Sequence, residues 1–229
     1  MPDLGAEHLK CEDRSNAPDL AASRLPMLER ARDAILQEAK TLMTVAARLD
    51  EQICLLADYI VSSSALVVVS GVGKSGLVGE KISATLVSTG TRSIALDPLD
   101  ALHGSLGRVC SGDVFLALSK SGQTDELIQM VRAFKTLPIR IALITANGSS
   151  ALAEMAHHVL DMGPVEEVGI LRLAPTASTT AMMAIGDALA VILEERRGFT
   201  RNDFARVHPG GNLGKVLARR DSYPENASY

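Results

Sequence analysis

The sequence DVFLALSKSGQTDE spans residues 113–126 and changes character halfway along. The apolar run at 113–118 predicts a buried strand, whereas the residues from Thr124 onward begin an amphipathic helix. The loop between them contains a glycine and the hydroxyl side chains of Ser119 and Ser121. Because the first N–H groups of a helix have no partner within the helix, a hydroxyl-rich loop at this point favours the binding of an anion.

A similar loop follows an earlier apolar run in ALVVVSGVGKSG, residues 65–76. Glycines, Lys74 and Ser75 again come between a predicted strand and a predicted helix. In sheets whose strands alternate with helices, ligands bind at the carboxyl ends of the strands, where such loops lie. The two loops together therefore predict a site for one phosphorylated ligand between them.

Two other interpretations of the first loop remain open. GVGKSG at 71–76 matches the GxGxxG pattern of dinucleotide-binding folds, with Asp97 as an approximate candidate for binding the ribose. An NAD-dependent enzyme would leave the loop at 119–124 without a role. The other alternative is a tight turn that binds nothing and has Ser75 as the helix N-cap. Lys74 counts against that turn, because the helix dipole repels a lysine at its N-terminus unless an anion lies between them.

The order of apolar segments predicts the fold class. Strands are expected at residues 65–69, 93–96, 113–118, 139–145 and 157–161, and helices at 75–89, 124–137, 150–155 and 176–197. Uniformly apolar strands joined by helices are typical of parallel sheets that are covered on both faces. We therefore predict an α/β fold, a three-layer α/β/α sandwich around a mostly parallel five-stranded sheet. One long or two consecutive amphipathic helices, at 25–62, are added at the N-terminus.

The helix at 176–197 is apolar around most of its circumference. Such a helix is either central to the fold or shared with another subunit. We favour the second alternative, which makes the helix part of an oligomeric interface.

Composition limits the class of protein further. With 229 residues that are 47% hydrophobic, the chain can bury one sizeable core. We expect a single domain at 25–218 between a flexible N-terminal tail, residues 1–24, and a polar C-terminal tail, residues 219–229. The net charge of -4 and the 3% aromatic content argue against nucleic acid as a partner.

Membrane and redox signals are also missing from the sequence. There is neither a secretory signal nor an apolar run of about 20 residues, so we expect no membrane partner. The cysteines at 11, 54 and 110 are odd in number and widely spaced, which argues against a disulfide framework and a structural zinc site. We expect a cytoplasmic protein.

Several motifs occur in the order found in one known family. They are GVGKSG (71–76), STGT (88–91), HGSLG (103–107), SKSGQTDE (119–126), LAPT (173–176), GDALA (186–190) and HPGG (208–211). Together they resemble the sugar isomerase (SIS) domain of arabinose-5-phosphate isomerases over residues 28–216. The chain ends soon after HPGG, so it is similar to a short form without the cystathionine-synthase-type (CBS) domains of longer members, and we expect no regulation by such domains.

The resemblance implies an aldose-ketose isomerase that interconverts D-ribulose 5-phosphate and D-arabinose 5-phosphate. In the family this reaction leads into the eight-carbon acid sugar of bacterial lipopolysaccharide. A proton moves between C1 and C2 through an enediolate, and such a transfer requires neither a cofactor nor a metal ion. The spacing of histidines and carboxylates shows no metal-ligand pattern either.

The resemblance also implies which residues are catalytic. The family's four functional positions correspond to Lys74, Glu126, Glu167 and His208. Lys74 is expected to stabilise the enediolate, Glu167 to move the proton, and His208 to exchange protons during ring opening. Glu126 is equally compatible with a simple complement to the dipole of the helix that it begins.

Substrate-binding residues are expected in both loops and at His103. The expected set is Ser75, His103, Ser119, Ser121 and Thr124, of which all but the histidine would bind the phosphate. In the family neighbouring subunits complete the pocket, so we expect a homodimer or homotetramer with His103 or His208 acting across the interface.

Four positions depart from the family's usual pattern. They are Ser105, Lys120, Gln123 and Arg172. The changes remove acidic groups and add cations near the expected pocket, which would tighten phosphate binding or alter which sugar fits. The alternatives are therefore a sensor that binds a sugar phosphate without converting it, and an isomerase of a different sugar phosphate. Retention of the four functional residues favours the enzyme, because a sensor needs only the serine-containing loop.

Overall fold

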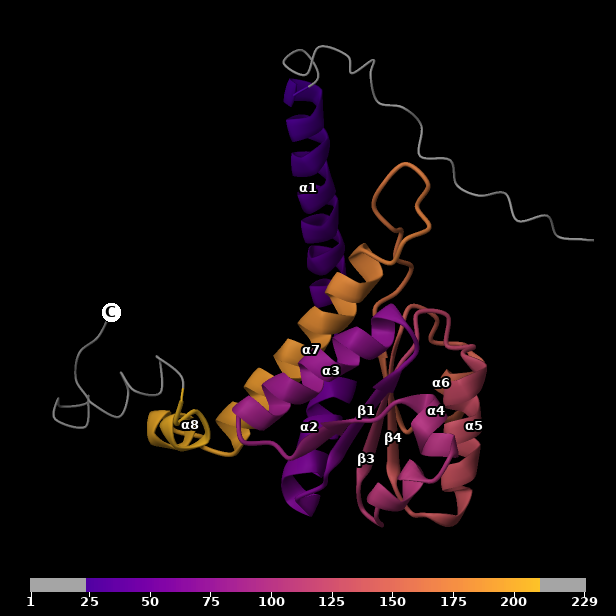
Figure 1. The fold of residues 1–229 in the computed structure, drawn as a ribbon, viewed down its shortest axis with the longest axis vertical. Helices are drawn as coiled ribbons and strands as arrows, with labels where there is room; N and C mark the ends of the chain where they lie inside the picture. Colours follow the sequence, from indigo (N-terminus) through magenta and orange to yellow (C-terminus); the bar gives the residue numbers. More distant parts are fainter. Residues whose placement is uncertain (1–23, 211–229) are drawn as a thin grey trace, which may run out of the picture. The chain divides into compact units, whose positions relative to one another are not determined.

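The computed structural model describes residues 24–210 (Figure 1). Its helices and strands are α1 Arg24–Arg48, α2 Gln52–Ser63, β1 Val67–Gly71, α3 Lys74–Ser88, β2 Ser93–Ala95, α4 Pro98–Leu102, η1 Ser105–Arg108, β3 Val114–Leu118, α5 Asp125–Ala133, η2 Phe134–Thr136, β4 Arg140–Thr145, α6 Ala151–Met155, β5 His158–Asp161, α7 Ala177–Arg196 and α8 Arg201–Val207. Residues 24–36, the first half of α1, form the described part of one compact unit, and residues 37–210 that of the other. The tails expected at 1–24 and 219–229 lie outside the described residues, apart from Arg24.

The five strands form one parallel sheet in the order β2-β1-β3-β4-β5. The last residues of β1 and β3, Gly71 and Leu118, are register partners, so the loops that follow these strands start side by side. From β1 the chain runs to β2, and from β3 it runs to β4, in opposite directions along the sheet. Open α/β sheets bind ligands at such a reversal of strand order.

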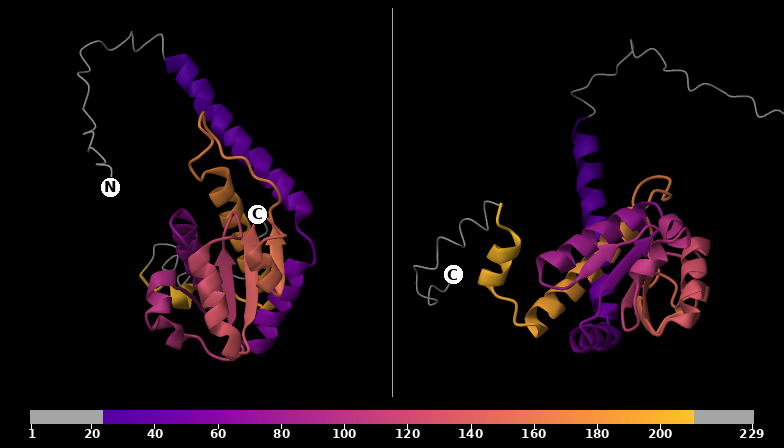
Figure 2. Two further views of the ribbon diagram at one scale, coloured as in Figure 1. Left: turned by 90° about the vertical axis from the view of Figure 1, so that its right-hand side faces the viewer. Right: turned by 60° about the horizontal axis from the view of Figure 1, so that its bottom comes forward.

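Helices cover both faces of the sheet (Figure 1 and Figure 2). One core lies between the sheet and α2, α3 and α7, and the β1 residues Val67 and Val69 contribute to it. The other core lies against α4, α5 and α6 and receives Val68. This division follows from the two-residue period of a strand. The predicted three-layer α/β/α sandwich is confirmed, and all of its strands are parallel.

Helix α7 packs in the core of the domain along part of its apolar surface, and its expected role in an oligomeric interface stays a prediction. It packs on α3 and α2, and a Cβ at Gly186 would lie 2.4 Å from Ile82 Cγ1. The missing side chain is therefore what lets α3 and α7 approach. Helix α7 is also long and apolar enough to cross a membrane. Half of its apolar stretch is buried inside the domain, however, as occurs in a core helix.

Three short elements, α4, η1 and α8, are not among the elements that the sequence pattern predicts. Helix α4 is capped by Asp97, whose Oδ1 accepts hydrogen bonds from Leu99 N at 2.8 Å and Asp100 N at 3.3 Å. This carboxylate is thus already engaged in the fold. The ribose candidate of the dinucleotide interpretation therefore has a structural role as the cap of α4.

Candidate active site

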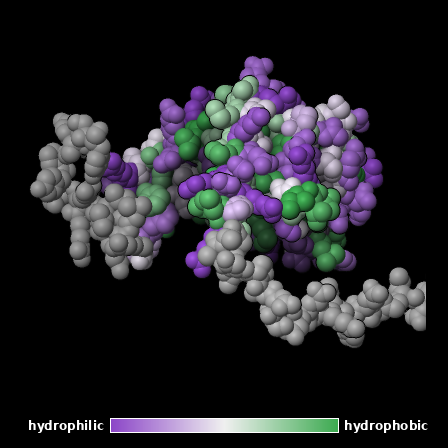
Figure 3. Space-filling model, turned by 90° about the horizontal axis from the view of Figure 1, so that it is seen from above, coloured by the Kyte–Doolittle hydropathy of each residue, from purple (hydrophilic) through white to green (hydrophobic). Residues whose placement is uncertain are grey.

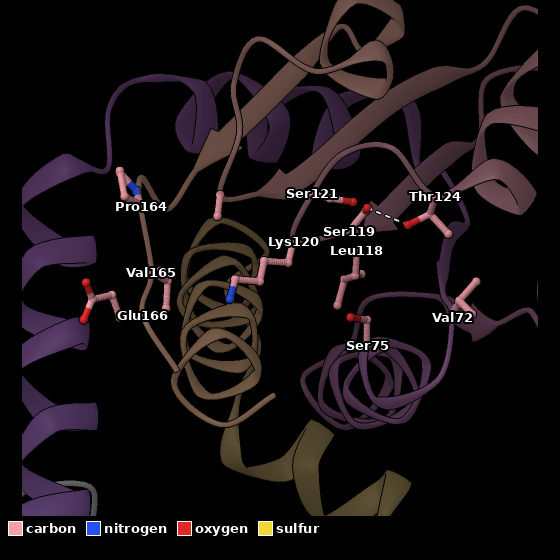
Figure 4. A pocket seen from close by; sticks show the side chains of 11 residues that line it. Val72, Ser75, Leu118, Ser119, Lys120, Ser121, Thr124, Pro164, Val165 and Glu166 are labelled. Carbon is pink, nitrogen blue, oxygen red and sulfur yellow. Dashed lines mark hydrogen bonds between the residues drawn. The ribbon is translucent and has the colours of Figure 1, made fainter. Parts of the chain in front are cut away.

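A pocket of about 530 Å³ lies at the carboxyl ends of the strands (Figure 4). It is lined by the end of β3, the first turn of α3 and the loops after β1, β3, β4 and β5. The lining residues are Val72, Ser75, Leu118, Ser119, Lys120, Ser121, Thr124, Ala146, Pro164, Val165 and Glu166. The loops after β1 and β3 therefore share one cavity, as the sequence predicts. Its volume is within the range of small-molecule sites.

The serine loop, residues 119–124, is held in shape by its own hydroxyl groups. Ser119 Oγ lies 2.7 Å from Thr124 Oγ1 and accepts a hydrogen bond from Gly122 N at 3.0 Å. Gly122 has a φ of +65°, and a Cβ there would lie 1.9 Å from Ser150 Oγ. Ser119 is buried and shapes the loop, whereas Ser121 is exposed and free to contact a ligand.

Helices α3 and α5 both begin at this pocket without a side-chain cap. Thr124 is the N-cap of α5, but its hydroxyl bonds to Ser119 instead of to the helix backbone. The N-cap of α3 is Gly73, with a φ of +61°, so Ser75 is not the cap that the tight-turn alternative requires. Two uncapped helix N-termini beside hydroxyl groups favour a phosphate.

Glycine is required in the first loop because α3 begins directly against the end of β1. A Cβ on Gly71 would lie 2.8 Å from the carbonyl carbon of Ser75, and one on Gly76 would lie 2.7 Å from the oxygen of Gly71. This close approach places Ser75 in the lining of the pocket (Figure 4). Lys74, one residue earlier, is exposed and does not line it.

Glu167 is a buried carboxylate whose two oxygens are both engaged. Oε1 accepts hydrogen bonds from Lys120 Nζ at 2.6 Å and Ser178 Oγ at 2.5 Å. Oε2 accepts them from Thr176 N at 2.8 Å, Thr176 Oγ1 at 3.2 Å and Ser178 N at 3.2 Å. The carboxylate thus joins the serine loop to the start of α7.

These contacts determine the ionisation of Glu167. Burial by itself raises the pKa of the carboxyl, but the hydrogen bonds from Lys120, Ser178 and the backbone of Thr176 outweigh it and lower the pKa to about 2. A carboxylate with so low a pKa is a weak base at neutral pH. In this arrangement Glu167 is suited to holding a cation.

The remaining predicted residues do not line this pocket. Glu126 is exposed in the first turn of α5, and His103 is exposed at the end of α4. His208 follows α8, with its ring stacked on Phe204 at 3.9 Å and its Nδ1 2.9 Å from the Phe204 oxygen. Within one chain the structure brings together Ser75, Ser119, Ser121 and Thr124, with Glu167 beside them. Lys74, Glu126, His103 and His208 stay predictions.

Sequence reasoning identified Lys120 only as a departure from a family pattern, and it did not find Thr176 and Ser178 as partners of Glu167. A lysine inside a serine-rich loop and hydroxyls at the start of an apolar helix were the available signals. Between residues 24 and 210, no group of three or more His, Cys, Asp or Glu side chains could hold a metal ion.

Comparison with known proteins places this geometry in a family. Residues 59–192 match the SIS domain. The chain is 43% identical over 195 residues to arabinose 5-phosphate isomerase KpsF of Escherichia coli O6:H1, covering 85% of this chain and 60% of that protein. It is 42% identical over 196 residues to arabinose 5-phosphate isomerase KdsD of Pseudomonas aeruginosa, covering 86% and 60%.

A solved structure shows the same architecture. The protein c3406 of E. coli CFT073, in complex with arabinose 5-phosphate, superposes with a TM-score of 0.78 at 33% identity, over 81% of this chain and 99% of that one. The chain spans about 60% of the length of the curated relatives KpsF and KdsD. The matched part contains both loops of the pocket and the start of α7. The chain therefore belongs to the SIS-domain family.

Proposed function

We propose that the protein is an aldose-ketose isomerase that interconverts D-ribulose 5-phosphate and D-arabinose 5-phosphate. The observation that carries the proposal is that hydroxyl groups and two helix N-termini lie in one pocket beside a lysine–carboxylate pair. The similarity to the KpsF and KdsD isomerases supports it over the part of their length that the chain spans. We place the protein in the cytoplasm, where its phosphorylated substrate would be.

The phosphate would bind at the serine loop. Ser121 and Ser75 present hydroxyl groups from the two loops, and the first N–H groups of α5 lie beside them. These neutral donors complement the negative charge of the phosphate without an arginine.

The sugar end of the ligand would then extend toward Lys120 and Glu167. Converting the ketose to the aldose removes a proton from C1, forms an enediolate, and returns a proton to C2. Both oxygens of Glu167 are engaged in hydrogen bonds. Glu167 could therefore remove that proton only after a contact with the substrate replaces its hydrogen bond to Lys120. Lys74 and Glu126 would contribute from the first turns of α3 and α5, and His103 or His208 from a neighbouring subunit.

A sugar-phosphate sensor is the second candidate, and the engagement of both Glu167 oxygens by Lys120, Thr176 and Ser178 is the observation in its favour. Incubation of the protein with D-ribulose 5-phosphate in heavy water separates the two. An isomerase incorporates deuterium at C2 of the aldose product. Ligand binding without deuterium incorporation would identify a sensor, and conversion of another sugar phosphate alone would correct the substrate.

Ser121→Ala is expected to raise KM for D-ribulose 5-phosphate by about 10-fold while kcat changes much less, because its exposed hydroxyl would contact the phosphate in both ground and transition states. Steady-state kinetics measure both constants. Ser149→Ala, an exposed serine outside the pocket lining, is the control. An unchanged KM for Ser121→Ala would remove the serine loop from the phosphate site.

We also propose that the protein is a homodimer or homotetramer whose sites are completed across the interface. The loop between β5 and α7 exposes Ile170, Leu171 and Leu173 by 87%, 77% and 78%. Viewed from above, the surface shows apolar side chains in green among polar ones (Figure 3). Val191 of α7 is a further exposed apolar residue, at 60%. Contact between subunits would remove such side chains from water.

Hybrid oligomers test this arrangement. If His208 acts in the neighbour's pocket, the inactive variants Glu167→Gln and His208→Ala should complement each other after they are refolded together. Statistical mixing of a dimer restores about one quarter of the wild-type activity, since half of the dimers are hybrids with one intact site each. Hybrids without recovered activity would show that each site is built from one subunit.

A further inference from the structure

We propose that Lys120 is the pocket cation that stabilises negative charge on the sugar oxygens during the reaction, and that Glu167 is the residue that positions it. The inference rests on the proposed isomerase function and deepens it, because it assigns the electrostatic role to a lysine other than Lys74. Lys120 lines the pocket, whereas Lys74 is exposed outside its lining.

Glu167 orients the Lys120 ammonium without engaging all of its hydrogen-bond donors. Its Nζ lies 2.6 Å from Glu167 Oε1, and its side chain is 40% exposed while that of Glu167 is 4% exposed. An ammonium group has three N–H donors, and Glu167 takes one of them within the described part of the chain. The others are available to a ligand in the pocket.

The backbone of Lys120 and the carboxylate that holds its ammonium are both fixed by hydrogen bonds. The Lys120 carbonyl accepts hydrogen bonds from Ala146 N at 3.0 Å and Thr145 Oγ1 at 3.2 Å, which ties its backbone to the end of β4. The Glu167 carboxylate is held in turn by Ser178 and Thr176 at the start of α7. A charge that is already in place stabilises a developing anion without a cost of reorganisation.

The direction of the side chain separates it from the phosphate site. In Figure 4 the Lys120 side chain extends away from Ser121 and Thr124 toward Val165, and its nitrogen points to that side of the pocket. A ligand with its phosphate at the serine loop would therefore present its sugar oxygens to Nζ.

Removal of the proton at the sugar end of the ligand creates an anion. When the C1–H bond of the ketose breaks, its electron pair forms the C1–C2 double bond, and the electrons of the carbonyl move to O2. An ammonium beside O2 favours this step more than it favours the bound ketose. Lys120 is therefore expected to act on kcat rather than on KM.

Lys120→Met, which keeps the aliphatic stem, tests the inference in the full-length protein. We expect kcat with D-ribulose 5-phosphate to fall by about 100-fold with KM changed by less than about threefold. Lys120→Arg should recover part of the rate, because the charge returns with a different shape. Lys81→Met is the matched control: Lys81 is similarly exposed and paired with Asp187, but it lies outside the pocket lining.

A binding measurement tests the same contact without turnover. Calorimetry with 4-phospho-D-erythronohydroxamate, which resembles the enediolate, is expected to show about 10-fold or greater loss of affinity for Lys120→Met. The affinity for inorganic phosphate should stay unchanged. Loss of both affinities would make Lys120 a phosphate ligand, and retention of both would make it a structural counter-ion, so either result overturns the inference. If the wild type does not isomerise the ketose but the hydroxamate result holds, only the proposed reaction fails.

Discussion

Replacing Glu167 by glutamine is expected to lower kcat by about 100-fold or more and to destabilise the fold by about 2–3 kcal/mol. A glutamine has one acceptor oxygen where the carboxylate has two, and its amide N–H₂ would face either Lys120 or the donors of Thr176 and Ser178. At least one buried donor loses its partner. Steady-state kinetics and urea denaturation measure the two effects.

The neighbouring Glu166→Gln is the control for stability. Its side chain is 81% exposed, and its salt bridge is with Arg172, so the free energy of unfolding should change by less than about 0.5 kcal/mol. An equal loss of stability in the two variants would contradict the assignment of Glu167 as a buried anchor.

A double-mutant cycle distinguishes the two roles considered for Glu167. If the carboxylate only positions Lys120, then Lys120→Met combined with Glu167→Gln should be no slower than Lys120→Met alone. If Glu167 is the base that removes the proton, the two losses in kcat should multiply.

The Glu167 carboxylate should also make the stability of the fold depend on pH in the acid range. The pKa of Glu167 is about 2 in the folded protein, below its ordinary value of 4.5. Its contribution to stability is thus present above pH 4.5 and is lost as the pH falls from 4.5 toward 2. In urea titrations the wild type should lose more stability than Glu167→Gln across this window. Parallel losses would show that Glu167 is not held as an ion.

Gly122→Ala is expected to cost about 2–4 kcal/mol of stability. Gly122 has a φ of +65°, and a Cβ would lie 1.9 Å from Ser150 Oγ and 2.4 Å from Ser150 Cβ. Ser150 cannot move away cheaply, because it is buried and its Oγ caps α6 by accepting a hydrogen bond from Ala153 N. The serine loop should shift as a result, which would also raise KM.

Gly198→Ala separates the two causes of that cost. Gly198 has a φ of +60° and nothing within 4 Å of a Cβ, so its replacement should show only the backbone strain, about 1 kcal/mol. Urea denaturation of both variants gives the comparison. If Gly122→Ala were no more destabilising than Gly198→Ala, the contact with Ser150 would not constrain the loop.

Much of the fold could be predicted because its signals are local. The apolar runs at 113–118 and 139–145 predicted strands that the structure places at Val114–Leu118 and Arg140–Thr145. The predicted helix at 124–137 instead ends as α5 at Ala133 and continues as the 3₁₀ turn η2. Boundaries of this kind depend on a single turn of backbone, which the hydrophobic period does not resolve.

The amino-acid sequence by itself determined the α/β class, the two glycine- and hydroxyl-containing loops and the strand ends at which they meet, because each depends on neighbouring residues. Only the tertiary structure decided what Lys120 and Glu167 do. They are 47 residues apart in the chain, and their pairing requires β3, the loop after β5 and the start of α7 to converge. The buried carboxylate, its ion pair with Lys120 and its pKa of about 2 result from that convergence. The burial and the hydrogen-bond partners of Glu167 come from segments that lie far apart in the sequence.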